Sequence, residues 1–387
     1  MPANDGQRLD WRGRRVLITG HTGFKGAWLS LWLQRLGAEV SGYALAPPTD
    51  PSLFGLADVA GGMRRSASGG EIRDLEGVLK IFRDSRPEIV MHLAAQSLVR
   101  PSYEQPVATF EANVMGTVHV LEAIRRTPEV RAAVVVTSDK CYENREWIWP
   151  YREDEPMGGR DPYSASKGCA ELVTASYRRS FFADPGAPQV ASARAGNVIG
   201  GGDWALDRLI PDLVRGVLSR RPVPIRSPDS IRPWQHVLEA LYGYVLLAEQ
   251  LFAGNPDAAG GWNFGPEDRD TRPVAWIVER LAESWREHTG ESIAYQMDAS
   301  RAGRGERRHP PEASILKLDS TKARTLLGWR PRLDLATALD WIVEWTRCYQ
   351  QGGDVRALCE EQIDRFLLLT AGPREAPAPK KGLPHVS

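Results

Sequence analysis

Gly20-His21-Thr22-Gly23-Phe24-Lys25-Gly26 follows a β-branched run at residues 15–19 and precedes the helical pattern AWLSLWLQRLG. A strand, a glycine turn and a helix in this order are typical of a dinucleotide-binding unit. The glycines permit a tight turn and let backbone N–H groups approach a pyrophosphate at the positive end of the helix. The alternative is a glycine-rich turn that holds no ligand. The residues predicted to contact the dinucleotide are Gly20, Thr22, Gly23, Phe24, Lys25 and Gly26.

The second strand does not carry the usual marker of NAD. An acidic residue about 20 residues beyond the glycines normally binds the ribose 2′-hydroxyl. Here that place reads Gly42-Tyr43-Ala44-Leu45, so this test leaves NAD or NADP open. His21 and Lys25 either neutralise pyrophosphate charge or are solvated surface residues.

The composition is that of an ordinary globular protein. Of 387 residues, 42% are hydrophobic and 25% charged, and 49 Lys and Arg balance 49 Asp and Glu. Neither a nucleic-acid nor a membrane partner is expected from a net charge of zero. The four cysteines are far apart and lack C-x-x-C spacing, so we predict free thiols and no metal site. No apolar stretch approaches the length of a membrane span, and we expect a soluble, cytoplasmic protein.

Strand and helix patterns alternate through the first half of the chain, which predicts an α/β fold with a Rossmann-type, doubly wound parallel sheet. We assign 11–195 mainly to this NAD-binding domain. Residues 196–370 form a smaller, mainly helical substrate lobe, interleaved with the sheet, and 371–387 form a disordered tail. Strands are predicted at 15–19, 39–43, 89–93, 132–137 and 190–193, and helices at 27–36, 78–85, 107–125, 209–218, 237–251, 274–285 and 335–349.

Tyr163 and Lys167 lie four residues apart and therefore on one face of a helix. A nearby ammonium favours the phenolate and lowers the pKa of the phenol toward values useful for a general base. The spacing alone is a weak signal, but it becomes specific when it follows the glycine motif.

With these motifs in family order, the chain resembles the extended short-chain dehydrogenase/reductases. The resemblance runs from Trp11 to about Trp345 and includes the segment HLAAQS at residues 92–97. It implies that Tyr163 is the acid/base, that Lys167 holds the nicotinamide ribose and that Ser138 hydrogen-bonds the sugar hydroxyl. On the cofactor side it further implies contacts from Glu71, Ile72, Leu93, Ala94, Ala95 and Asn113.

One segment makes the resemblance more specific. Within the family, Thr137-Ser138-Asp139-Lys140 resembles the corresponding segment of nucleotide-sugar 4,6-dehydratases. These enzymes typically place an Asp after the hydroxyl residue, to protonate the departing C6 hydroxyl, and then a Glu as the C5 base. Here Lys140 takes the place of the Glu, so the identity of the base stays open. Asp139 as a helix cap or loop carboxylate is the alternative. The Asp-Lys pair and long strings such as TSDKCYEN and IRPWQHVLE resemble CDP-glucose 4,6-dehydratases, which implies CDP-glucose as substrate and NAD as recycled cofactor.

Three other functions compete with this one. They are a nucleotide-sugar 4-epimerase or reductase, a dehydratase of another nucleotide sugar, and a non-catalytic NAD-binding regulator. The resemblance also implies a homodimer through a four-helix bundle built from helices near 107–125 and 164–181. The residues predicted to contact the substrate are Gln96, Ser138, Asn197, Arg208, Arg232 and Trp234.

Overall fold

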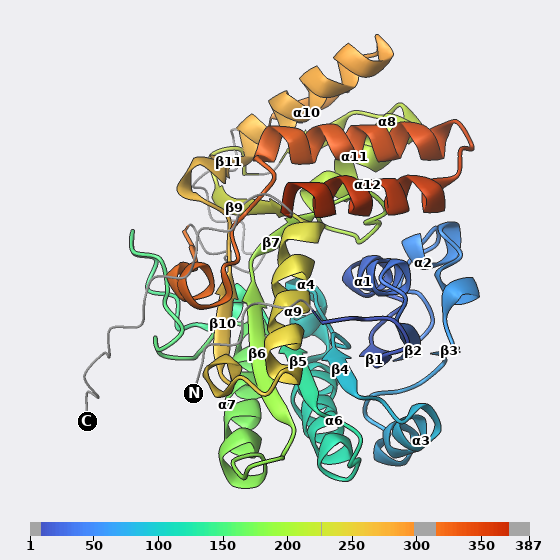
Figure 1. Ribbon diagram of the computed structural model, residues 1–387. Coiled ribbons are helices and arrows are strands. Elements are labelled where there is room, and N and C mark those ends of the chain that lie inside the picture. The colour runs from blue at the N-terminus through green and yellow to red at the C-terminus, as the bar shows by residue number, and fades with distance from the viewer. Residues whose placement is uncertain (1–8, 226, 298–314, 371–387) are drawn as a thin grey trace.

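A seven-stranded parallel sheet forms the centre of the molecule (Figure 1). The computed structural model describes residues 9–225, 227–297 and 315–370. The strand order, β10-β6-β5-β4-β1-β2-β3, confirms the predicted doubly wound arrangement. The strands are β1 (Arg15–Thr19), β2 (Glu39–Ala44), β3 (Arg65–Ser68), β4 (Ile89–His92), β5 (Ala132–Val136), β6 (Gln189–Ala195) and β10 (Gly261–Phe264).

Both faces of the sheet are covered by helices. In β1, Val16 and Ile18 face one hydrophobic core, whereas Leu17 faces the other, as the period of two in a strand requires. The first core is closed by α1 (Phe24–Arg35) and α9 (Val237–Phe252). The second is closed by α3 (Leu75–Ser85), α6 (Gly116–Arg125) and α7 (Pro162–Phe181).

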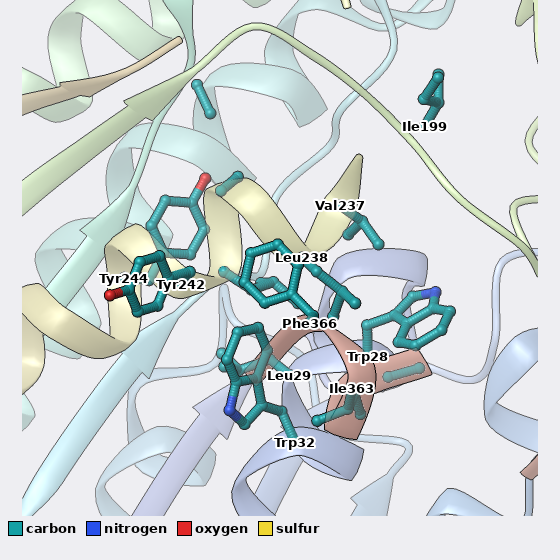
Figure 2. Packing of buried hydrophobic residues seen from close by; sticks show 14 of the residues in the cluster. Trp28, Leu29, Trp32, Ile199, Val237, Leu238, Tyr242, Tyr244, Ile363 and Phe366 are labelled. Carbon is teal, nitrogen blue, oxygen red and sulfur yellow. The ribbon is translucent and has the colours of Figure 1, made fainter. Parts of the chain in front are cut away.

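The C-terminal part places helices α10, α11 and α12 beyond the carboxyl ends of the strands (Figure 1). Phe366 of α12 packs edge-on against Trp32 of α1 and Tyr242 of α9, at ring distances of 5.6 and 5.8 Å (Figure 2). This aromatic contact packs α12 against the sheet domain. The helices are α8 (Leu209–Ser219), α10 (Val274–Thr289), α11 (Leu335–Gln350) and α12 (Val355–Thr370). Two small sheets, β11-β9-β7 and β12-β8, comprise β7 (Asn197–Ile199), β8 (Val223–Ile225), β9 (Ile231–His236), β11 (Thr271–Pro273) and β12 (Tyr295–Met297).

Short helical segments connect these elements. The predicted helix 107–125 is in fact three consecutive segments, with a π-helical turn in the middle. The segments are α2 (Leu53–Leu56), η1 (Val59–Gly62), α4 (Val99–Glu104), α5 (Pro106–Phe110), the π turn η2 (Glu111–Met115), η3 (Asp139–Cys141), η4 (Pro256–Ala258), η5 (Asp268–Asp270) and the π turn η7 (Ala323–Leu327).

The other predicted elements match the observed ones to within a few residues. Helix α12, strands β3 and β10 and the strands of the two small sheets (β7, β8, β9, β11 and β12) were not among them. The sheet takes β10 from the C-terminal half of the chain, so the two proposed domains share it. The predicted tail, 371–387, lies outside the described residues. No helix in the described part of the chain is long and apolar enough to span a bilayer.

Candidate active site

A cavity of about 1640 Å³ opens at the carboxyl ends of the strands. Its walls come from the loops after β1, β4 and β5, from α7, and from β7, β9 and the loop before α8. All the predicted site residues except Asn113 line it. They are Gly20, Thr22, Gly23, Phe24, Lys25, Gly26, Glu71, Ile72, Leu93, Ala94, Ala95, Gln96, Ser138, Asp139, Lys140, Tyr163, Lys167, Asn197, Arg208, Arg232 and Trp234.

In the glycine loop, the backbone at Gly20 and Gly26 lies directly against other backbone atoms. Gly20 has φ +79°, and a Cβ there would lie 2.7 Å from the nitrogen of Ala94. A Cβ on Gly26 would lie 2.1 Å from the carbonyl oxygen of Gly20. Only glycine fits at these two positions, and the first turn of α1 consequently reaches the cavity.

His21 is neither a phosphate ligand nor a surface residue, which corrects both sequence interpretations. It is fully buried, its Nε2 lies 2.8 Å from the Ser66 hydroxyl, and its ring occupies the space that a Cβ on Gly42 would need. Burial lowers the pKa of His21 to about 4, so the ring is neutral at neutral pH.

Lys25 does face the cavity. Its Nζ donates to the Tyr244 hydroxyl at 3.4 Å. Burial, and then the charges of Arg208 and Lys167, lower the pKa of Lys25 to about 8. Its positive charge therefore lies near the catalytic candidates rather than in bulk solvent.

Tyr43 lies at the end of β2, where NAD-binding proteins usually carry an acidic residue that binds the ribose 2′-hydroxyl. Its hydroxyl donates to the carbonyl of Glu71 at 3.1 Å, and its ring lines the cavity. The Glu71 carboxylate pairs with Arg73 at 2.7 Å. Tyr43, Glu71 and Ile72 thus form one wall at the end of the cavity bordered by β2 and β3.

Ser138, Tyr163 and Lys167 meet where β5 ends beside α7. Burial raises the pKa of Tyr163 to about 12, although its hydrogen bond with Ser138 acts in the opposite direction. The expected lowering of this pKa is therefore wrong for the described residues, because desolvation outweighs it. Burial also lowers the pKa of Lys167 to about 8, and its Nζ donates to the Val136 carbonyl at 3.3 Å.

Asp139 is buried in the same wall. It accepts a hydrogen bond from the Ser138 hydroxyl at 3.0 Å, while the Lys140 backbone N–H donates to Ser138 Oγ at 3.2 Å. Burial raises the pKa of Asp139 despite the nearby Lys140 and Lys25. A carboxyl that holds its proton to higher pH than usual is suited to act as an acid.

Asn113 lies behind the cavity, in the π turn, and organises it from there. Its amide nitrogen donates to the Gln96 carbonyl at 2.9 Å and to the Ser166 hydroxyl at 2.8 Å, and its oxygen accepts from the Gln96 N–H. The Gln96 side chain bonds Leu98 and Thr109, so it shapes this loop.

The opposite wall carries the residues predicted for the nucleotide. Asn197 on β7 pairs in register with Trp234 on β9, and Arg208 at the start of α8 forms an ion pair of 3.1 Å with Asp203. Arg232 on β9 also lines the cavity, so two guanidinium groups belong to this wall.

Sequence reasoning missed two features. Arg100 of α4 and Asp207, in the loop before α8, both line the cavity and form an ion pair of 2.6 Å between segments that are distant in sequence. Glu171 lies below the cavity. Its spacing of four from Lys167 was the available signal, whereas nothing in the sequence pairs Arg100 with Asp207.

A Rossmann-type sheet with Ser138, Tyr163 and Lys167 at its carboxyl edge defines the short-chain dehydrogenase/reductase class. Within that class, the family model described as GDP-mannose 4,6 dehydratase matches residues 17–341. The chain belongs to this family.

The comparisons with individual proteins give a consistent relationship. The chain is 50% identical over 364 residues to a CDP-glucose 4,6-dehydratase of Salmonella typhimurium, covering 93% of this chain and 98% of that one. A dTDP-glucose 4,6-dehydratase of the same organism is 26% identical, with 86% and 92% covered. The crystal structure of the Thermus thermophilus UDP-glucose 4-epimerase complex with NAD is similar at TM-score 0.70 and 25% identity, covering 86% of this chain and 99% of that one.

Proposed function

We propose that this chain is a lyase that converts CDP-glucose to CDP-4-keto-6-deoxyglucose and water. The observation that carries the proposal is the placement of Asp139 beside Ser138 in the cavity that also holds Tyr163. An epimerase needs the hydroxyl and the phenol but has no use for this acid. The similarity to a CDP-glucose 4,6-dehydratase over nearly the full length supports the same substrate.

The glycine loop fits NAD, with which the similar epimerase structure is in complex. A Cβ at 20 or 26 would meet backbone atoms of Ala94 or Gly20, so only glycine permits the tight turn that brings the loop's N–H groups to the cavity, where a pyrophosphate would bind. Gly20, Thr22, Gly23 and Gly26 would hold the pyrophosphate, and Lys167 the nicotinamide ribose. When bound, NAD supplies a reversible hydride acceptor and a positive charge that favours the Tyr163 phenolate.

The chain's own residues perform the proton transfers. Ser138 orients the sugar 4-hydroxyl, and Tyr163 removes its proton as C4 is oxidised. The ketone at C4 acidifies the C5 proton. Loss of the C5 proton and donation of the Asp139 proton to the C6 hydroxyl then release water and leave a C5–C6 double bond. The hydride taken from C4 would return to C6, and a proton to C5, to complete the 4-keto-6-deoxy product. The raised pKa of Asp139 increases the fraction of the carboxyl that is protonated at a given pH.

We assign the removal of the C5 proton to Lys140, which lines the cavity beside Asp139. In D2O, the product formed by the unchanged chain should carry one deuterium at C5, because the base returns a solvent-exchanged proton. Lys140→Met should lower the rate of product formation roughly 100-fold or more. Deuterium at C5 appearing at the normal rate in this variant, measured by NMR, would remove Lys140 from the mechanism.

The wall formed by Asn197, Arg208, Arg232 and Trp234 is proposed to bind the nucleotide diphosphate. Guanidinium groups bind phosphate oxygens through paired hydrogen bonds. Arg208 forms an ion pair with Asp203, so its guanidinium is already oriented at the cavity wall.

A homodimer is proposed through α5, η2 and α7. Val107, Met115, Leu172 and Phe181 are between 46% and 69% exposed on these adjacent helices, a burial pattern that suits a self-complementary interface. Leu172→Glu should convert the dimer to a monomer in analytical ultracentrifugation. Leu326→Glu, at a similarly exposed site on η7, should not.

A further inference from the structure

Below the cavity, α7 carries a third residue in the same row as Tyr163 and Lys167. Glu171 follows Lys167 by four residues, as Lys167 follows Tyr163, so the three side chains lie on one face of the helix. That face packs against η3 and the end of β5. The side chain of Glu171 is only 5% exposed, and its partner Arg194 is equally buried. A buried carboxylate so close to the reaction centre requires an explanation.

The carboxylate is held by three donors from three different residues. The Thr137 hydroxyl donates to Oε1, and the Ser192 hydroxyl donates to Oε2 at 2.6 Å. The Arg194 guanidinium also donates to Oε2, at 2.8 Å. Burial raises the pKa of Glu171, but the Arg194 charge and these hydrogen bonds outweigh it, and the pKa lies below its usual range. Glu171 is therefore ionised at neutral pH.

Two consecutive residues at the end of β5 are thereby fastened to α7. Lys167 bonds the carbonyl of Val136, and Glu171 accepts from the side chain of Thr137. The next residues along the chain are Ser138 and Asp139. A displacement of Thr137 would consequently move the hydroxyl and the acid relative to Tyr163.

We propose that Glu171 is a positioning residue for the dehydration, which holds the end of β5 against α7 and supplies the negative charge that keeps Lys167 an ammonium. This inference rests on the proposed function of Tyr163 and Lys167. Glu171 does not line the cavity, so it acts through its neighbours.

The titratable groups around Lys167 indicate why Glu171 in particular would keep it an ammonium. Glu171 lies on the same helix, Cys141 on η3, Lys25 on α1 and His92 on β4. The Cys141 thiol and the His92 ring are neutral, because burial raises the pKa of the thiol and lowers that of the imidazole to about 3. Lys25 adds a positive charge. Glu171 is thus the negative charge that offsets the desolvation of Lys167.

The sign of the pH effect follows from these charges. The attraction of Glu171 raises the pKa of Lys167, against a larger lowering by burial. Removal of the Glu171 charge should lower that pKa further. The ammonium would then be lost at lower pH, and the alkaline limb of kcat/KM should move down by about one pH unit. The misplaced β5 end should also lower kcat roughly 10- to 100-fold.

The test compares Glu171→Gln with Glu171→Asp in the NAD-loaded enzyme, using CDP-glucose. The Gln variant should shift the alkaline limb, whereas the Asp variant, which keeps the charge, should lower kcat without the shift. Titration of NAD binding by calorimetry gives a second readout. The pH above which NAD affinity falls should move down by the same unit in the Gln variant alone.

Two further variants separate positioning from plain stability. Glu171→Gln/Arg194→Met removes both buried charges, so this double variant should be more stable than Glu171→Gln alone. The alkaline limb of its kcat/KM profile should stay shifted, as in the single variant. Glu239→Gln changes an equally buried carboxyl group on α9, which accepts hydrogen bonds from the N–H groups of Arg332 and Leu333, and should leave the pH profile unchanged.

A folded Glu171→Gln variant with an unchanged profile would overturn the inference. So would a double variant whose activity returns together with its stability. If the unchanged chain forms no product from CDP-glucose, the proposed function fails instead. The pH dependence of NAD affinity then still tests Glu171.

Discussion

At the scale of single residues, burial shifts both the acid and the phenol of the proposed reaction toward their protonated forms. Asp139 and Tyr163 lie in one wall of the cavity, and desolvation raises the pKa of both. The same desolvation that suits Asp139 to donate a proton makes its ionised form costly to bury. A substitution that removes the acid at this position should therefore lower the activity and raise the stability of the protein.

Asp139→Asn tests this opposition. Because the folded-state pKa of Asp139 is raised, its contribution to stability is present at low pH and is lost as pH rises through that pKa. As pH rises, the ionised form of the buried carboxyl becomes increasingly costly, so in alkaline solution the neutral amide should raise the free energy of unfolding by about 1 kcal/mol. The variant should lose roughly 100-fold or more in kcat. Urea unfolding and steady-state kinetics check the two effects, and a less stable or fully active variant would contradict them.

Sequence patterns predicted most of these residues but neither their pKa shifts nor their burial. The motifs located Ser138, Asp139, Tyr163 and Lys167, and the structure brings them together. The pKa of Tyr163 and the burial of His21 depend on which segments enclose them, and short-range spacing carries no such information. His21 lies against Gly42 and Ser66, which come from two other strands.

At the scale of elements, the junction of β1 and α1 is the most constrained turn of the fold. The strands and helices of the first half were predictable because their alternating apolar positions reflect two covered faces. β3 was missed because its sequence, RSAS, is polar, and β10 because its sequence, GWNF, contains Gly and Asn and no β-branched residue. The π turn at Glu111–Met115 was missed because such a turn interrupts a helix without a sequence signal such as Pro.

Gly20→Ala and Gly186→Ala form a matched pair for this junction. Both glycines have positive φ, +79° and +86°, so each alanine should cost about 1 kcal/mol of backbone strain. Only at Gly20 would the new Cβ meet backbone atoms, whereas nothing lies within 4 Å at Gly186. Gly20→Ala should therefore lose several kcal/mol of stability and measurable NAD binding. Equal effects of the two substitutions, by thermal unfolding and calorimetry, would refute the close-approach account.

At the scale of the whole molecule, three buried histidines link stability to pH. Burial lowers the pKa of His21 to about 4 and those of His92 and His236 to about 3. The unfolded chain binds these protons near pH 6.5, so each histidine contributes stability that is lost as pH falls below that value. Glu239, whose pKa burial raises to about 8, acts in the opposite direction.

His21→Gln isolates one of these contributions while keeping a donor for Ser66. Between pH 6 and 4.5, the free energy of unfolding of the unchanged chain should fall more steeply than that of the variant. The difference in slope should approach about 1.4 kcal/mol per pH unit. Urea titrations across this range measure it. Parallel curves would show that His21 titrates normally in the folded protein.

The central claim is that this cavity removes water from CDP-glucose, and one measurement tests it most directly. The purified, NAD-loaded protein is incubated separately with CDP-glucose, dTDP-glucose, GDP-mannose and UDP-glucose, and the products are analysed by mass and NMR. We predict a loss of one water from CDP-glucose alone, abolished by Tyr163→Phe. An unchanged mass with an inverted C4, or dehydration of a different nucleotide sugar, would contradict the account.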